Sequence, residues 1–546
     1  MDSLLSGVRP FHIVVAHPIR IELGVSNRST SEEDVSNTQT QDERTRLLRF
    51  GLTSRHDSSV DALTTTTLTL VIAGLYATYS MVRYAQFRTG GYDLGIFDQA
   101  VRNYAHLKPP FAPIKGYQYN LLGDHFHPLL IVFSPFYWLW DDPRVLLLGQ
   151  ALAVAACVPV LVRMCDRRMG PVLSRLMVMI FMVSWPLQGL IDFDFHEICL
   201  AMPLLCLAFD ALDRRHPAAF LTWSILLIGV REDMGLVVTM LGIVWIVQPH
   251  RDHAQPLETR QQLTVGIAMA LIGAISFVLV VGVLIPHFSG GGSYGYWDYP
   301  DLGTGPSAMV QSILTHPGGA FHLVVDNATK RQTIGWLALP LLCLFLLSPR
   351  WIAATPLIIE RFWSSRQLLW EPRFHYNAPI FLILFIAAVD ALGSRPVRRC
   401  RTPLSWAMLA ALAITVPVVH TANPLADPFA QLPGQIAAHS SPSVQASREA
   451  LALIPADVCV TADDRLVTQL TRSNRVTVPG TTTPAPAYIL LDMSQPDTGG
   501  GLDDPRTVLK SAVSSGYDVI FDKNAILLLR GSDTRPDPSR CGPTAP

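Results

Sequence analysis

The sequence contains repeated apolar stretches that are long enough to cross a lipid bilayer. They run to about 15–24 residues, and a helix needs about 20 apolar residues to span the hydrocarbon core. Hydrophobic residues make up 49% of the 546 residues and charged residues only 16%, whereas soluble domains carry roughly 25% charged residues. The predicted fold class is therefore an α-helical polytopic membrane protein.

The hydropathy pattern predicts about eleven helices, several of them shorter than a full span. They are expected near residues 65–87, 143–163, 173–192, 198–212, 217–230, 234–248, 263–286, 334–348, 351–362, 376–393 and 403–420. The segment PLLIVFSPFYWLW (128–140) is expected to lie at the interface or to re-enter the membrane, because Trp and Tyr favour the headgroup level. The helices form a predicted membrane domain over residues 61–422.

The two ends of the chain differ from this pattern. Residues 1–60 are polar and poor in aromatic residues, which predicts a disordered tail without a cleavable signal peptide. Beyond residue 440 strand-like runs alternate with helix-like runs, which predicts a small α/β domain over 440–532 and a disordered tail over 533–546. The strand-like runs are ADVCVTAD, RVTVP, AYILLDM, YDVIFDK and AILLLRG. The α/β domain lacks a G-x-G-x-x-G or Walker motif, so nucleotide binding is not indicated.

Basic residues near the helix ends predict the orientation, since cytoplasmic loops are enriched in Lys and Arg. Alternating the expected helices places the arginine clusters of the tail and of several turns on the cytoplasmic side. These clusters are Arg44, Arg46, Arg49 and Arg55; Arg163, Arg167 and Arg168; Arg214 and Arg215; Arg251 and Arg260; and Arg395, Arg398, Arg399 and Arg401. We therefore expect a multi-pass protein of the cell membrane with a cytoplasmic N-terminus and an extracytoplasmic C-terminal domain.

Charge and cysteine content narrow the partners. The formal net charge of −1 gives no reason to expect nucleic acid. The eight cysteines form no C-x-x-C pair, so neither a zinc site nor a thioredoxin-type motif is indicated. Cys459 and Cys541 lie beyond the membrane domain, where an oxidising exterior permits them to form a disulfide. Free thiols at both positions in non-reducing mass spectrometry would contradict that pairing.

The predicted outer face collects polar, aromatic-rich motifs from distant parts of the chain. They are GGYDLGIFDQ (90–99), LGDHFHP (122–128), DFDFHE (192–197), RED (231–233) and EPRFHYN (371–377). The inner turns are plainly basic, whereas these motifs combine Asp, Glu, His, Arg and Tyr. Ionisable groups at a membrane boundary mark a functional site by default.

The first motif holds the two predicted catalytic residues, Asp93 and Asp98. On a helix they would lie about 140° apart, so a paired-carboxylate dyad is not implied. One of them is expected to act as a general base for an acceptor hydroxyl, and the other to cap a helix or hold an arginine. The alternative is that both are caps in a solvated loop.

The remaining motifs hold the predicted substrate-binding residues. These are Asp124, His125, Asp194, His196, Glu197, Arg231, Glu232, Asp233, Arg373 and His375. No cofactor is certain, and a divalent metal is left open, because Asp124, His125 and His127 have side chains that ligate such ions. The alternative for Asp124 is a cap on the helix that begins near Pro128.

Each of the other groups also has a structural alternative. The acidic residues of 192–197 would stabilise a helix N-terminus, and 231–233 would be a tight exposed turn. Arg373 runs against the positive-inside trend, which a bound anion explains, although Trp and Tyr nearby also fit an interfacial anchor. The Gly- and Tyr-rich stretch within 287–332 suits a mobile loop over a site or a plain linker.

Five motifs, taken in their order along the chain and followed by an α/β tail, resemble domain-of-unknown-function family 2079, a family of bacterial membrane proteins, over roughly residues 65–530. The motifs are YDLGIFDQ, LGDHFHP, FDFHE, VREDMG and FHYNAP. That family looks like a member of the C-type glycosyltransferases, multi-span enzymes that use polyprenyl-phosphate sugars outside the cytoplasm. Those enzymes carry an essential Asp in the first outer loop, and the matching positions here are Asp93 and Asp98. This sequence lacks the adjacent acidic pair that many relatives carry. The resemblance implies that outer arginines such as Arg231 or Arg373 hold the lipid phosphate.

The sequence therefore favours a glycosyltransferase that moves a sugar from a polyprenyl-phosphate donor to an envelope glycan or protein at the outer face. A non-enzymatic transporter or flippase is an alternative, because buried charges also line permeation routes. An envelope scaffold whose tail recognises a partner is a third reading.

Overall fold

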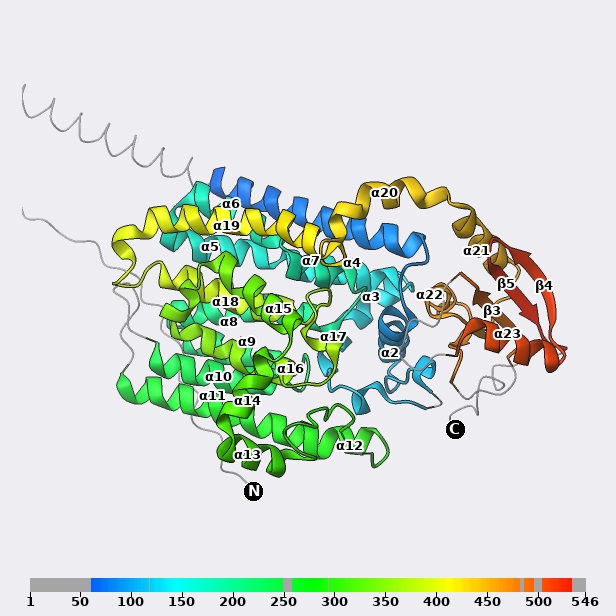
Figure 1. Cartoon of the computed structure of the whole chain (residues 1–546), viewed down its shortest axis with the longest axis horizontal. Helices are drawn as coiled ribbons and strands as arrows, with labels where there is room; N and C mark the ends of the chain where they lie inside the picture. The colour runs from blue at the N-terminus through cyan, green and yellow to red at the C-terminus, as the bar shows by residue number, and fades with distance from the viewer. Residues whose placement is uncertain are drawn as a thin grey trace, which may run out of the picture. The chain divides into compact units, whose positions relative to one another are not determined.

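The computed structural model of the chain describes residues 60–116, 118–248, 258–292, 294–481, 486–494 and 503–532. The predicted disordered tails lie outside the described residues, with the exception of Val60. The described part is mostly helical, and a small sheet lies near its C-terminal end (Figure 1).

Four helices of the described residues are long and apolar enough to cross a membrane: Val60–Ala85, Arg144–Met169, Thr259–Phe288 and Arg398–Ala422. A fifth candidate is the pair α6 (Pro171–Met182) and α7 (Trp185–Asp192), which are bent by 45° at their junction. Shorter apolar helices are Pro128–Leu139, α9 (Pro217–Ile228), α10 (Met234–Val247) and α18 (Asn377–Ala391). The count of about eleven spans therefore stays a prediction.

Within the long candidates, several shorter segments follow one another directly. Arg144–Met169 consists of α4 (Arg144–Ala155) and α5 (Cys157–Met169), and Thr259–Phe288 of α11 (Thr259–Leu279), η6 (Val280–Leu284) and α12 (Ile285–Phe288). Arg398–Ala422 consists of η10 (Arg398–Cys400) and α19 (Arg401–Ala422).

Close packing of α10 against α11 depends on glycine. A Cβ atom on Gly242 would lie 2.5 Å from the carbonyl oxygen of Gly266, and one on Gly273 would lie 2.4 Å from that of Gly235. Small residues allow two membrane helices to approach backbone to backbone, where apolar burial alone gives little drive for association. These glycines therefore permit the contact that positions the N-terminus of α10.

The expectation of one helix near 334–348 is wrong. Helix α15 (Ala328–Ala338) ends there and is followed by the short 3₁₀ turns η7 (Leu339–Leu341) and η8 (Leu344–Leu347). Leu342 and Cys343 have φ values of 52° and 53°, and Pro340 cannot donate a helical hydrogen bond. The segment is apolar, as predicted, but its helical backbone is interrupted between Ala338 and Leu344. The helical segment 128–140 is made of η4 (Pro128–Phe133) and α3 (Ser134–Leu139).

The C-terminal part contains the expected alternation of strands and helices. The strands are β1 (Cys459–Ala462), β2 (Arg475–Thr477), β3 (Tyr488–Asp492), β4 (Asp518–Lys523) and β5 (Ile526–Arg530), in the order β2-β1-β3-β5-β4. β1 pairs in parallel with β2 and β3, whereas β5 runs antiparallel to β3 and β4. The helices are α21 (Pro442–Ala452), α22 (Asp464–Val467) and α23 (Pro505–Ser514).

The segment that follows the first helix, which we call the first outer segment after its predicted side, joins this sheet region to the membrane helices. It consists of η1 (Gly91–Gly95), a single π-helical turn, and α2 (Ile96–Ala105), which continues it. α22 packs against η1, and Figure 1 shows α22 between α2 and the strands of the sheet. The site described below lies at this contact.

Candidate functional site

A cavity of about 220 Å³ lies where the outer motifs meet the C-terminal region. Its charged lining residues come from the end of the first helix, from η1, from the loop after α7, from the loop before α18 and from α22. They are Arg83, Arg88, Asp93, Asp192, Asp194, Arg373, Asp464 and Arg465. Chain segments nearly 400 residues apart in sequence thus share one cavity, and it contains the predicted residues Asp93, Asp194 and Arg373.

One arginine of the cavity, Arg83, is paired with two carboxylates. Arg83 donates to Asp192 Oδ1 at 2.5 Å and to Asp194 Oδ1 at 2.9 Å. The other oxygen of Asp194 accepts the backbone N–H of Gly90 at 2.7 Å. Asp194 has a φ of 59°, a conformation that costs a non-glycine residue energy and that surrounding contacts must hold in place. This acidic residue therefore fixes the start of the first outer segment.

Three other arginines of the cavity, Arg88, Arg373 and Arg465, have no carboxylate partner within 4.0 Å among the described residues. Burial and the nearby charge of Arg83 lower the pKa of Arg88. Guanidinium groups suit phosphate because their planar fork donates two parallel hydrogen bonds. The cavity therefore presents cationic donors to an anion.

Asp93 lies on η1 and lines the cavity. Its side chain makes no hydrogen bond to another described residue. Burial raises its pKa, and the neighbouring charges of Asp194, Asp464 and Glu197 add to this effect, while Lys115 opposes it. A carboxylate with a raised pKa and no fixed partner is a stronger proton acceptor than an ordinary carboxylate.

Asp98, the other predicted catalytic residue, lies in a different environment. Its side chain is fully buried and accepts two hydrogen bonds from Nη2 of Arg102, at 2.9 and 2.8 Å, and one from the hydroxyl of Tyr137 at 2.8 Å. None of these residues lines the cavity. The structure thus brings Asp93 but not Asp98 into the cavity.

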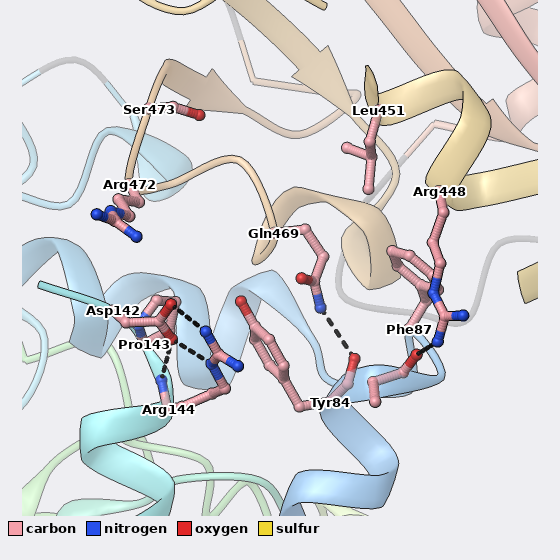
Figure 2. Close-up of a pocket in the computed structure, with 11 residues that line it drawn as sticks. Tyr84, Phe87, Asp142, Pro143, Arg144, Arg448, Leu451, Gln469, Arg472 and Ser473 are labelled. Atoms are coloured by element: carbon pink, nitrogen blue, oxygen red, sulfur yellow. Dashed lines mark hydrogen bonds and ion pairs between the residues drawn. The ribbon is translucent and has the colours of Figure 1, made fainter. Parts of the chain in front are cut away.

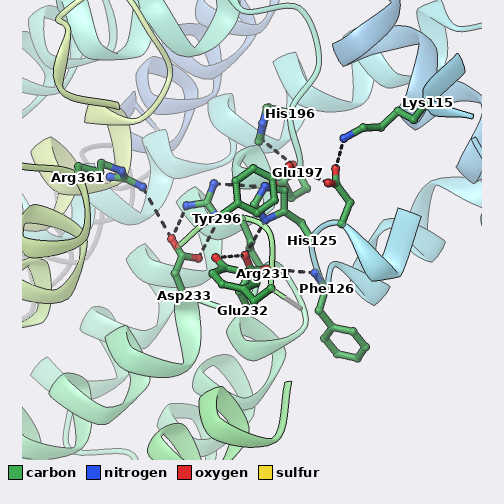
Figure 3. A network of polar contacts seen from close by, with 12 residues as sticks. Lys115, His125, Phe126, His196, Glu197, Arg231, Glu232, Asp233, Tyr296 and Arg361 are labelled. Atoms are coloured by element: carbon green, nitrogen blue, oxygen red, sulfur yellow. Dashed lines mark hydrogen bonds and ion pairs between the residues drawn. The ribbon is translucent and has the colours of Figure 1, made fainter. Parts of the chain in front are cut away.

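A second group of side chains, which we call the polar network, lies at the N-termini of α8 (Ala201–Asp213) and α10 (Figure 3). It comprises Asp124, His125, His196, Glu197, Arg231, Glu232, Asp233 and Arg361. His125 Nδ1 contacts Glu232 Oε1 at 2.6 Å, and the second oxygen of Glu232 accepts the N–H of Phe126 at 3.1 Å. These predicted residues from distant motifs are therefore in direct contact.

Arg231 is the centre of the polar network. Its Nε donates to Asp233 Oδ1 at 2.9 Å, and its Nη1 lies 3.6 Å from Glu197. Arg361 approaches Asp233 at 3.8 Å from α16 (Thr355–Phe362). The arginine and its carboxylates are all buried, and buried charges persist only when paired. The network is therefore a built site and not an exposed turn.

Two histidines connect the polar network to the loop before α18. The rings of His196 and His375 stack with centroids 3.8 Å apart, and His196 Nδ1 lies 2.7 Å from Glu197. His375 is fully buried, and neither ring nitrogen has a hydrogen-bond partner among the described residues. Burial and the charges of His196 and the nearby arginines lower its pKa, so its imidazole is neutral and can accept or donate a hydrogen bond.

The predicted Asp and His metal ligands do not converge on one point. Asp124 binds Lys115 and accepts the hydroxyls of Tyr119 at 2.9 Å and Tyr296 at 2.7 Å, whereas His125 turns toward Glu232. Across the described residues, no group of three or more His, Cys, Asp and Glu side chains is arranged to hold a metal ion.

The Gly- and Tyr-rich loop lies over the polar network, as one of its two sequence interpretations proposed. Tyr296 stacks on His125 with centroids 4.2 Å apart, and the hydroxyl of Tyr294 donates to Glu232 at 3.2 Å. Arg366 lies over the Tyr296 ring, 5.1 Å from its centroid. Glu232, which pairs with the imidazole of His125, thus also binds this loop.

Sequence reasoning missed several residues of the cavity. Arg83, Arg88, Asp192, Asp464 and Arg465 line the cavity but are not among the site residues predicted from the sequence. Asp192 stands within the DFDFHE motif, which could have drawn attention to it. Asp464 and Arg465 carry no comparable signal, because they belong to a soluble-looking segment far along the chain.

The family comparison agrees with the resemblance carried by the motifs. The model of the family described as "Predicted membrane protein (DUF2079)" matches residues 83–528. The chain belongs to this family. No curated protein matches the DUF2079 chain.

Solved structures similar to the DUF2079 chain include ArnT from Cupriavidus metallidurans bound to undecaprenyl phosphate. The two chains are 14% identical with a TM-score of 0.46, and the match covers 88% of this chain and 99% of that one. The apo state of the same protein has 13% identity, a TM-score of 0.48 and coverage of 88% and 100%. The Archaeoglobus fulgidus oligosaccharyltransferase complex with Zn and sulfate has 12% identity, a TM-score of 0.42 and coverage of 78% and 68%. At TM-scores below 0.5 these likenesses are too distant to establish a shared fold.

Proposed function

We propose that this membrane protein transfers a sugar from a polyprenyl-phosphate donor to an acceptor of the cell envelope at the outer face of the membrane. The single observation that carries this proposal is the composition of the cavity. It combines an unpartnered carboxylate, Asp93, with three arginines that lack a carboxylate partner, Arg88, Arg373 and Arg465.

The arginines supply what a departing phosphate requires. When a sugar leaves a phosphate, negative charge develops on the phosphate oxygens, and fixed donors aimed at that charge lower the barrier. Arg83 is held by Asp192 and Asp194, so its charge is already balanced. Arg88, Arg373 and Arg465 are the groups that bind the phosphate.

Asp93 acts on the acceptor. Its carboxylate removes the proton of the acceptor hydroxyl, while the acceptor oxygen forms a bond to the anomeric carbon of the sugar. The bond between that carbon and the phosphate oxygen breaks, and its electron pair leaves on the polyprenyl phosphate. The proton remains on Asp93 until it passes to solvent, so atoms and charge balance.

The polar network is assigned to the sugar and the acceptor. Arg231 and Asp233 are held by their hydrogen bond to each other and Glu232 by its contact with His125, and fixed polar groups orient hydroxyl-rich ligands best. His375 offers an unused ring nitrogen beside His196. We therefore keep the predicted substrate-binding residues of the polar network, together with His375, in this role, whereas Arg373 is assigned to the phosphate and Asp194 holds Arg83.

Asp93→Asn and Asp98→Asn form a matched pair that tests the proposal. A deletion strain is analysed by lipid mass spectrometry for an accumulated lipid-linked sugar, and each variant is returned to it. Asp93→Asn is expected to keep the wild-type unfolding free energy and to lower turnover by at least ~100-fold, because general base catalysis contributes roughly 10²–10⁴-fold.

Asp98→Asn is expected to destabilise the protein by about 3 kcal/mol, since it disrupts a buried pair, with turnover that follows the amount of folded protein. Full complementation by Asp93→Asn would overturn the assignment of the base. Absence of any accumulated lipid-linked sugar in the deletion strain would overturn the transferase, and loss of lipid flux instead would indicate a flippase.

A further inference from the structure

We infer that the C-terminal α/β region is part of the site: Asp464 is a positioning residue that caps the turn carrying Asp93, and Arg465 is a phosphate ligand. This inference rests on the proposed function for Arg465, whereas the role of Asp464 stands on contacts alone. The segment that follows β1 therefore completes a site whose other residues lie in the membrane part of the chain.

The turn η1 begins without a cap of its own. Its N-cap position is Gly90, which has no side chain to accept a hydrogen bond. The first amides of any helical turn have no partner within the turn, so a side chain, water or ligand must supply one. Most helices solve this with a neighbouring Ser, Thr, Asp or Asn.

Asp464 takes the place of that missing cap from more than 370 residues away in sequence. Its Oδ1 accepts the N–H of Gly91 at 2.8 Å and the N–H of Tyr92 at 3.1 Å. A carboxylate at this position is also stabilised by the partial positive charge at the N-terminal end of the turn. Asp93 is the next residue, so the backbone that carries the proposed base is held by the C-terminal region.

The glycines of η1 are required for this contact. A Cβ atom on Gly91 would lie 2.4 Å from Cγ1 of Val467 and 3.2 Å from Oδ1 of Asp464. A Cβ atom on Gly90 would lie 2.8 Å from Oδ2 of Asp464. A side chain at either position therefore pushes α22 away from η1.

Further contacts hold the C-terminal region against the end of the first helix and the residues that follow it. The hydroxyls of Thr89 and Thr468 are 3.0 Å apart, and Gln469 donates to the carbonyl of Tyr84 at 2.9 Å (Figure 2). Arg448 of α21 donates to the carbonyl of Ala85 at 3.2 Å. The interface is polar and directional, so it specifies one arrangement of the C-terminal region on the first outer segment.

Arg465 follows directly from this arrangement. Because Asp464 is fixed on η1, the next residue lines the cavity together with Arg88 and Arg373. Its guanidinium has no carboxylate within 4.0 Å among the described residues. The C-terminal region thus contributes both the support of the base and one of the three free cations.

The test of the cap uses hydrogen exchange of the full-length protein in nanodiscs, without substrate. Asp464→Ala is expected to speed amide exchange at Gly91 and Tyr92 by about 10-fold, the effect of losing a charge-assisted hydrogen bond, and Asp464→Asn is expected to restore much of the protection. The matched control is Asp504→Ala, because Asp504 caps α23 by accepting the N–H of Arg506 at 2.8 Å. Unchanged exchange at 90–98 in Asp464→Ala would overturn the positioning role, whatever the activity of the protein.

The test of Arg465 uses farnesyl phosphate as the probe in a binding titration of the same protein. Arg465→Gln is expected to weaken binding by about 10-fold, and Arg506→Gln, in the same region but outside the cavity, is expected to leave it unchanged. Equal binding by Arg465→Gln and wild type would overturn the ligand role. If wild type binds the probe but transfers no sugar, the proposed transferase fails while the anion site stands.

Discussion

At the scale of single residues, the roles of the aspartates are decided by their partners. Asp93, Asp98 and Asp194 lie within or near the same outer boundary, yet Asp98 is neutralised by Arg102, Asp194 is bound to Arg83, and only Asp93 is unpartnered. The chemistry of a carboxylate depends on the charges and donors within about 4–6 Å of it. Residue type alone therefore could not separate base from anchor.

The ion pair of His125 and Glu232 predicts how the stability of the protein depends on pH. Burial opposes the charged imidazolium, but Glu232 and Asp124 overcome this and raise the pKa of His125 from 6.5 to about 9. A raised pKa in the folded state stabilises the protein fully below pH 6.5, and this stabilisation is lost as the pH rises through about 9.

Glu232→Gln is therefore expected to lower the free energy of unfolding by about 1–3 kcal/mol at pH 6, with a difference from wild type that shrinks toward pH 10. Denaturant titrations at several pH values in detergent measure it. Glu449→Gln, which breaks an exposed pair with Lys523, serves as the control and should change the unfolding free energy by less than about 1 kcal/mol at every pH. A pH-independent effect of Glu232→Gln would contradict the charged pair.

At the scale of elements, the site is built by the ends of helices and not by their lengths. The N-termini of α8, α10 and α18 meet at the polar network, whereas their C-termini carry a separate set of ion pairs. In that set Arg167 contacts Asp210 at 2.7 Å and Asp213 at 2.9 Å, and Arg350 contacts Asp390 at 3.1 Å. One end of the helix bundle therefore consists of paired basic residues, and the other end holds the candidate site.

We expect the loop between α12 and α13 (Pro306–Thr315) to limit the access of solvent to the polar network. Tyr296→Ala removes the ring that stacks on His125 and the hydroxyl that binds Asp124. Faster amide exchange is expected at residues 121–126, because the hydroxyl no longer holds Asp124 and the imidazole becomes accessible. Gly305→Ala is the control in the same loop, since a Cβ atom there meets nothing within 4 Å. Unaltered exchange in Tyr296→Ala would show that the loop does not cover the network.

At the scale of the whole molecule, motifs from distant parts of the chain are brought close together by the packing of the helices. Predicted site residues from the five motifs lie either in the cavity or in the polar network, and Asp98 lies in neither. Their placement on the outer side of the membrane remains part of the proposal.

The orientation is tested by cysteine labelling in intact cells. Cys400 is an exposed free thiol in a turn predicted to be cytoplasmic, and Asp503→Cys introduces an exposed thiol near the start of α23. A membrane-impermeant maleimide is expected to label residue 503 but not Cys400 until the cells are opened. The reverse pattern would place the C-terminal region in the cytoplasm. Cys459 is disulfide-bonded, whereas Cys541, its predicted partner, lies outside the described residues.

The elements of this protein were predictable where one local signal dominated. Hydropathy located the first helix, α9, α10, α18 and α19 to within a few residues, and strand-like runs located all five strands of the sheet. The helix near 334–348 failed because Pro340 and two left-handed residues interrupt an apolar run that hydropathy reads as continuous. Hydropathy measures transfer to lipid and carries little information about backbone breaks.

The sequence by itself determined the membrane class, the α/β character of the C-terminal region, the family and most members of the candidate site, because each follows from local composition or from an ordered set of motifs. Only the tertiary structure decided which aspartate is free, that Arg88, Arg373 and Arg465 share a cavity, and that Asp464 caps the turn beside Asp93. The physical reason is that charge pairing and capping act over a few ångströms. Whether two residues come that close depends on the packing of the whole chain and not on their separation in sequence.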